Sequence, residues 1–118
     1  MAKKLAALRE QGVLIIGSGN IVHNLRAISW EYIDQIGAGY DWAFAFRETV
    51  NQAIATQDDG TLVHYEQLGK KAELSVPTPD HYLPLLYIMA LREPQDKITF
   101  FNDNLIAGSL SMTSVLVG

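Results

Sequence analysis

The sequence predicts an α/β fold, with a partial mixed sheet flanked by helices. Three observations indicate it: a continuous apolar run at residues 13–16, two later apolar runs at residues 98–101 and 112–117, and amphipathic stretches between them. Short β-branched runs are typical of buried strands, whereas apolar residues every three or four positions indicate helices. No linker, repeat or low-complexity run divides the chain, so we expect a single domain over residues 1–118.

The chain opens with a predicted helix at residues 2–11, which Gly12 ends before the strand at residues 13–16. The turn Gly17-Ser-Gly-Asn20 comes next, and its glycines permit positive φ or a close approach of backbone. A second helix is expected to follow this turn and to run to about Trp30, with its apolar side chains facing inward.

His23 is the first candidate site residue. It lies just past the carboxyl end of the predicted strand, where open α/β sheets bind their ligands. The glycine turn lacks the third small residue of a dinucleotide fingerprint, and no Gly-Lys-Ser/Thr follows it. Metal or proton chemistry therefore fits His23 better than phosphate binding. A helix-start histidine without a chemical role, or a small nucleotide-binding module based on the glycines alone, remain as alternatives.

The middle of the chain is predicted to be helical scaffold. Asp41 is expected to cap an amphipathic helix over residues 42–56, followed by a short helix over residues 61–68. His64 lies in this short helix without a second metal-binding residue four positions on, so we interpret it as structural. The apolar face of the longer helix is predicted to hold Trp42, Phe46, Thr49, Val50 and Ala53, and its polar face Arg47, Glu48, Asn51 and Gln52.

His81 is the second candidate. Thr78 as N-cap and Pro79 at the first helical position predict a helix start, and Asp80 complements the helix dipole. His81 would then lie near the positive end of the dipole, which favours the neutral imidazole that ligates metals. Pro84 is expected to bend this helix and so to fix the direction of His81.

Composition excludes several classes of function. The formal net charge of -4 and the absence of a basic patch give no support for nucleic-acid binding. The chain has no cysteine, which excludes disulfides, thiolate metal sites and cysteine nucleophiles. It also has no signal-peptide core and no apolar run long enough to cross a bilayer. We expect a cytoplasmic protein with neither a nucleic acid nor a membrane as partner.

Two stretches resemble a known family. Gly17-Ser-Gly-Asn-Ile-Val-His-Asn-Leu-Arg26 and Pro77-Thr-Pro-Asp-His81 are similar to the carboxy-terminal half of the class III extradiol ring-cleavage dioxygenases, in the 4,5-DOPA dioxygenase branch. Asp41-Trp-Ala43, Leu83-Pro-Leu85 and the Ser-Leu-Ser-Met-Thr-Ser run that ends at Ser114 support this, and the likeness covers nearly the whole chain. Asp80 stands where the family often has Glu.

The resemblance implies an activity and a site. Family members cleave a catechol such as DOPA beside its two hydroxyls, with O₂ as co-substrate and a non-haem Fe(II); bacterial relatives can carry Zn(II). By resemblance, His23 matches the catalytic acid–base histidine, which is sometimes counted among the metal ligands, and His81 matches a metal ligand. Open coordination positions suit Fe(II) oxygenation, and histidine exchanges protons near neutral pH. No further cofactor-binding residue is implied.

The family's other metal-binding histidines lie in an amino-terminal half that has no counterpart here. We therefore expect the chain to supply part of the site, to be inactive alone, and to form a homo-oligomer or associate with the missing half. The alternative is a non-catalytic structural or interaction subunit derived from the same fold. Geometry distinguishes them: the enzyme hypothesis predicts that the imidazoles of His23 and His81 point into one cleft within reach of a common ion, and the alternative predicts that they lie on separate faces.

Overall fold

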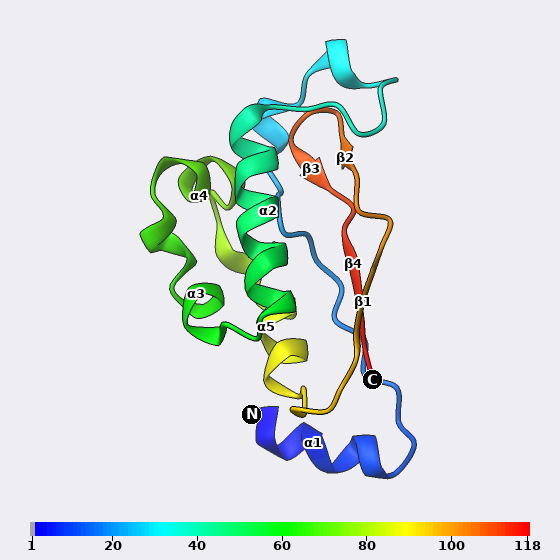
Figure 1. The fold of residues 1–118 in the computed structure, drawn as a ribbon. Helices are drawn as coiled ribbons and strands as arrows, with labels where there is room; N and C mark the ends of the chain where they lie inside the picture. Colours follow the sequence, from blue (N-terminus) through cyan, green and yellow to red (C-terminus); the bar gives the residue numbers. More distant parts are fainter. Residues whose placement is uncertain (1) are drawn as a thin grey trace.

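The computed structural model describes residues 2–118, and Met1 of the predicted domain lies outside them. Figure 1 shows a long central helix with shorter helices on one side and paired strands on the other. The helices are α1 (Ala2–Glu10), α2 (Asp41–Ala55), α3 (Asp59–Val63), α4 (Lys70–Ser75) and α5 (Leu83–Ala90). Single 3₁₀ turns are η1 (Leu25–Ala27), η2 (Trp30–Tyr32), η3 (Tyr65–Leu68) and η4 (Pro79–His81). The strands are β1 (Ile98–Phe101), β2 (Leu105–Ile106), β3 (Leu110–Ser111) and β4 (Ser114–Val117).

The strands form two short antiparallel pairs. β1 pairs with β4 from Ile98 opposite Val117 to Phe101 opposite Ser114, and β2 pairs with β3. An isolated antiparallel bridge also joins His23 to β3. Helices packed on small sheets confirm the predicted α/β class, and β1 and β4 correspond to the two predicted carboxy-terminal strands.

The core lies around α2, which contacts α3 and α4 on one side and β3 on the other. Its apolar face points into this core, as the helical spacing predicts, and burial of that face is the main force that holds the layers together. The largest fully buried apolar side chains are Tyr82, Phe46, Ile54, Leu62, Leu105, Val22 and Val50.

Arg47 corrects the prediction for the polar face of α2, because the structure buries it. Its guanidinium donates to the Asp103 carbonyl at 3.3 Å, and its Nε lies 3.6 Å from the Asp103 carboxylate. The guanidinium carbon also lies 5.2 Å from the centre of the Phe44 ring. A buried charge requires such partners, and Asp103 belongs to the distant β1–β2 connection, which helical periodicity does not reveal.

The predicted strand at residues 13–16 is wrong. These residues belong to no strand, and Leu14 and Ile16 are 76% and 78% exposed. A strand needs a hydrogen-bonded neighbour, and the described part of the chain places none beside this segment. The preceding helix is confirmed as α1, and Arg9 attaches it to the rest of the molecule through a 2.8 Å ion pair with Asp96.

The predicted helix from His23 to Trp30 is also wrong. Asn24 caps the single turn η1 by accepting hydrogen bonds from the N–H groups of Arg26 and Ala27, and Ile28 then turns the backbone away. Trp30, which was expected to face inward, is 81% exposed. Asparagine competes with a helix in this way by offering its side chain to nearby backbone groups.

Two further helix predictions change at their boundaries. The helix predicted at residues 61–68 is divided at His64 into α3 and η3, and α3 begins early because Asp58 accepts the Thr61 N–H. The predicted start at Thr78 and Pro79 is confirmed, but it opens η4 rather than a long helix. None of the helices within residues 2–118 has the length and apolar character needed to cross a membrane.

Candidate functional site

The imidazoles of His23 and His81 stack face to face. Their ring centres are 3.6 Å apart and their planes are inclined by 19°. Both residues are partly exposed, and 41% of the His81 side chain remains accessible. The structure therefore brings together the two histidines that the sequence singles out, whereas His64 lies exposed between α3 and η3.

His23 is held by backbone contacts on both sides. Its N–H donates to the carbonyl of Ser75 at the end of α4, at 2.8 Å, and it forms the bridge to Leu110 of β3. The side-chain amide of the neighbouring Asn24 donates to the Leu74 carbonyl at 2.8 Å, and Val22 is fully buried. The ring of His23 therefore projects from a segment clamped between α4 and β3.

His81 is held by a buried neighbour and by the glycine turn. The next residue, Tyr82, is fully buried, and its hydroxyl donates to the Leu62 carbonyl at 2.9 Å. The carbonyl of His81 accepts the Asn20 N–H at 2.7 Å. Because Tyr82 fixes the junction of η4 and α5, and Asn20 fixes the backbone of His81, both sides of this residue are tied to the core.

The glycines of the turn allow this contact. A Cβ on Gly19 would overlap the His81 carbonyl oxygen, and a Cβ on Gly17 would lie 2.9 Å from the Ile88 side chain and 3.0 Å from the Pro84 carbonyl. Neither glycine has a positive φ. Their role in the fold is therefore close packing of the turn against η4 and α5, which was one of the two explanations that the sequence left open.

Asp80 contacts the candidate site, which the sequence did not predict. One of its carboxylate oxygens lies 3.3 Å from His81 Nε2. A hydrogen bond from the Thr78 side chain, aided by the Asp80 N–H, lowers the pKa of this carboxyl below its ordinary value, and the charges of His81 and His23 lower it further. Asp80 was expected only to complement a helix dipole. Its position next to a candidate ligand is the signal that could have indicated the contact.

Pro84 does not bend a helix, contrary to the prediction. The backbone breaks at Tyr82, between η4 and α5, and Pro84 lies in the first turn of α5. Proline costs no intrahelical hydrogen bond there, since the first N–H groups of a helix have no partner within it. His81 therefore precedes α5 instead of lying in its first turn, and its direction depends on the fixed backbone around it.

The stacked pair does not by itself fit a metal ion. Imidazole binds a metal in the plane of its ring, at about 2.0–2.1 Å for zinc. Two nearly parallel rings 3.6 Å apart direct their nitrogen lone pairs side by side, so these cannot meet at one ion. In addition, no group of three or more His, Cys, Asp or Glu side chains within residues 2–118 is arranged to hold a metal.

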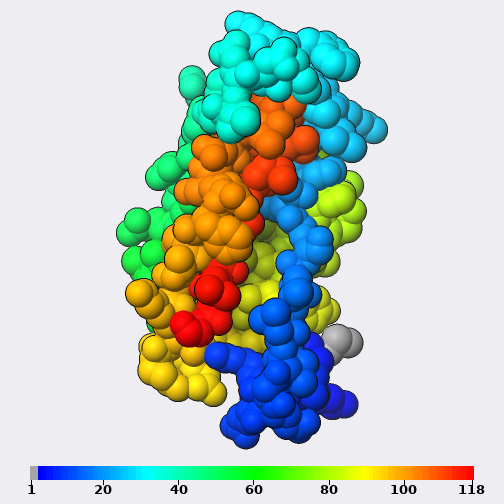
Figure 2. Space-filling view, turned by 90° about the vertical axis from the view of Figure 1, so that its right-hand side faces the viewer, coloured from blue at the N-terminus to red at the C-terminus, as the bar shows by residue number. Residues whose placement is uncertain are grey.

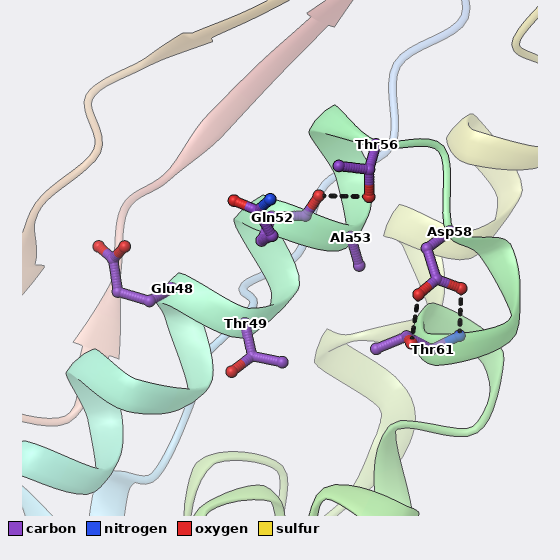
Figure 3. A pocket seen from close by; sticks show the side chains of 7 residues that line it. All are labelled: Glu48, Thr49, Gln52, Ala53, Thr56, Asp58 and Thr61. Atoms are coloured by element: carbon purple, nitrogen blue, oxygen red, sulfur yellow. Dashed lines mark hydrogen bonds between the residues drawn. The ribbon is translucent and has the colours of Figure 1, made fainter.

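A pocket away from the histidines lies between α2 and the turn before α3. This pocket of about 400 Å³ is lined by Glu48, Thr49, Gln52, Ala53, Thr56, Asp58 and Thr61 (Figure 3). Its polar groups are largely used within the fold: the Thr56 hydroxyl donates to the Gln52 carbonyl, and Asp58 accepts from both the N–H and the hydroxyl of Thr61. We therefore assign no chemistry to it.

A solved structure shares the fold of this chain. The chain superposes on a crystal structure described as uncharacterized protein JW3007 from Escherichia coli K12, with a TM-score of 0.87 and 41% sequence identity. The match covers 99% of this chain and 48% of that chain. The chain thus has the fold of about half of that longer chain. No protein-family model matches the chain.

Two curated relatives of the same name match nearly the whole chain. The chain is 41% identical, over its whole length, to 4,5-DOPA dioxygenase extradiol from Escherichia coli (strain K12), of which it covers 43%. It is 27% identical over 97% of its length to 4,5-DOPA dioxygenase extradiol from Beta vulgaris, of which it covers 41%. The chain thus spans less than half the length of these relatives. These matches confirm the resemblance to the 4,5-DOPA dioxygenase branch of the extradiol dioxygenases, over part of its length.

Proposed function

We propose that this chain forms the carboxy-terminal portion of the catalytic domain of an extradiol ring-cleavage dioxygenase that opens a catechol such as DOPA with O₂. The observation that carries the proposal is the stacking of His23 on His81. The two rings come from the two stretches that resemble the family's histidine motifs, in a chain 41% identical to a protein named for this activity. The rings lie together rather than on separate faces, which is the part of the enzyme prediction that supports this proposal.

His23 is proposed as the acid–base residue. A partly exposed imidazole on a fixed backbone can accept a proton from a catechol hydroxyl and return it near neutral pH. His81 is proposed as a metal ligand, for Fe(II) or Zn(II), after its ring turns away from His23. Since the stacked pair does not fit a metal ion alone, residues outside this chain must complete the site.

The test is reconstitution. The chain would be produced together with the portion of the Escherichia coli relative that it does not cover, supplied with Fe(II), and assayed with DOPA for oxygen uptake. We expect activity from the combination and none from the iron-loaded chain alone. His23→Ala is expected to lower kcat by about 10²–10⁴-fold, the usual contribution of a general acid–base residue. His81→Ala should lower both activity and bound iron.

His64→Ala is the matched control, since His64 is an exposed histidine away from the stacked pair. It should leave activity unchanged. Ring cleavage by the iron-loaded chain alone would refute the incomplete site. Activity that survives His23→Ala would refute its acid–base role.

A non-catalytic subunit is the second candidate function. It is favoured by the failure of the stacked rings to fit a metal ion. The stacked rings, with Asp80 against His81 Nε2, form a polar contact that needs no ion. A well-formed complex that binds no iron and consumes no oxygen would support this alternative.

A further inference from the structure

Residues 13–19, which we term the open segment, leave their backbone groups unpaired apart from the N–H of Val13. The N–H of Val13 donates to the Leu8 carbonyl, and the next backbone hydrogen bond along the chain is that of Asn20 to His81. Between these two points, the described part of the chain offers no hydrogen-bond partner to any N–H or carbonyl. Unpaired backbone groups in a row form the kind of edge that accepts another strand.

The side chains of the open segment fit the same role. Leu14 and Ile16 are 76% and 78% exposed, whereas Ile15 between them is less exposed and lines a shallow pocket with Ile88 and Leu91. Only residues 14–16 alternate in this way, as in an extended chain, because Val13 and residues 17–19 are exposed as well. Figure 2 shows the segment (blue) running uncovered along one face of the molecule. Large apolar side chains exposed in sequence on such a face indicate an interaction surface.

A second apolar surface, at η2 and the loop after it, makes a useful contrast. Trp30 and Ile36 are 81% and 75% exposed, but the backbone around them is already used. The N–H groups of Tyr32, Ile33 and Gly37 donate to the carbonyls of Ser29, Trp30 and Leu105. This surface therefore cannot accept a strand, which leaves the open segment as the better candidate.

We infer that the open segment is the docking edge for a β-strand from the portion of a 4,5-DOPA dioxygenase-like protein that this chain does not span. The inference rests on the proposed function for the identity of the partner. A structural observation supports it independently of that function. The match to the solved relative covers 99% of this chain but only 48% of the relative. The rest of such a protein must contact this portion somewhere. Strand addition would pair the free backbone groups and cover Leu14 and Ile16 together.

The experiment measures binding without reference to activity. The full chain is co-produced with the uncovered portion of the Escherichia coli relative, and the mass of the product is measured by light scattering. We expect an equimolar complex. Ile16→Lys should weaken it by about tenfold or more, because a charge would replace an apolar side chain that the complex is expected to cover. Ile36→Lys is the matched control, with nearly the same exposure at the other apolar surface, and should leave the complex intact.

Backbone amide exchange of the free chain gives a second measurement. Amides of residues 14–19 should exchange without protection in the free chain and become protected in the complex. Protection in the monomeric free chain would overturn the inference, as would a complex indifferent to Ile16→Lys or a homodimer that Ile16→Lys dissociates. A complex that forms as expected but lacks ring cleavage would contradict the proposed function and leave the docking edge standing.

Discussion

Tyr82→Ala is expected to lower the free energy of unfolding by about 3–5 kcal/mol, the usual cost of removing a large buried aromatic ring. Tyr82 is fully buried, with its ring centre 4.4 Å from that of Tyr65 and 6.3 Å from that of Phe46. Burial raises the pKa of its phenol, so the hydroxyl stays protonated and donates to the Leu62 carbonyl. Chemical denaturation followed by circular dichroism measures the change.

Tyr82→Phe is the matched control, because it keeps the ring and removes only the hydroxyl. The loss of one buried hydrogen bond is expected to cost about 0.5–1.5 kcal/mol. Equal losses in the two variants would contradict a role of the ring in holding the core together. Tyr82 follows His81 directly, so the alanine variant should also loosen the histidine pair, whereas the phenylalanine variant should preserve it.

Gly19→Ala is expected to have the second-largest effect. A methyl group at this position would overlap the His81 carbonyl oxygen. The methyl is attached directly to the backbone and the carbonyl is part of it, so neither can rotate away. The turn must shift off η4, which would break the hydrogen bond from Asn20 to His81 and separate the two imidazoles. We expect a loss of about 1–3 kcal/mol in unfolding free energy, typical of overpacking, and loss of activity in the reconstituted complex.

Gly60→Ala provides the control for the same substitution elsewhere. A Cβ on Gly60 meets only Asp58 Oδ1 at 3.5 Å, an ordinary contact, and Gly60 lies within α3. Alanine is favoured over glycine in a helix by up to about 1 kcal/mol, so this variant should be as stable as the wild type or slightly more stable. A Gly19→Ala protein with wild-type stability would contradict the close packing of the turn on His81.

The fold could be predicted where a local pattern was sufficient. The spacing of Phe46, Val50 and Ala53 predicted the buried face of α2, and the apolar run at residues 98–101 predicted β1. Prediction failed where the outcome depended on distant residues. The run at residues 13–16 has the composition of a strand but finds no neighbour within the described residues. Arg47 follows the polar pattern of its helix, yet it is buried beside Asp103, a residue far away in the sequence.

The candidate site divides in the same way. Local sequence singled out His23 and His81, although the strand and the helix expected on either side of His23 are absent from the structure. The contact of Asp80 with His81, and the packing of Gly19 on the His81 carbonyl, both depend on how η4 lies against the glycine turn. Because that arrangement joins segments far apart in the chain, no spacing within either segment could predict it.

The pairing of His23 with His81 can be tested most directly by nuclear magnetic resonance of the histidine ring protons. In stacked rings each imidazole shields the other, so the ring protons of His23 should resonate upfield and move downfield in His81→Ala. His64→Ala should leave them in place. Resonances of His23 that do not respond to His81→Ala would show that the two rings do not meet, and would contradict the shared site on which the proposed function depends.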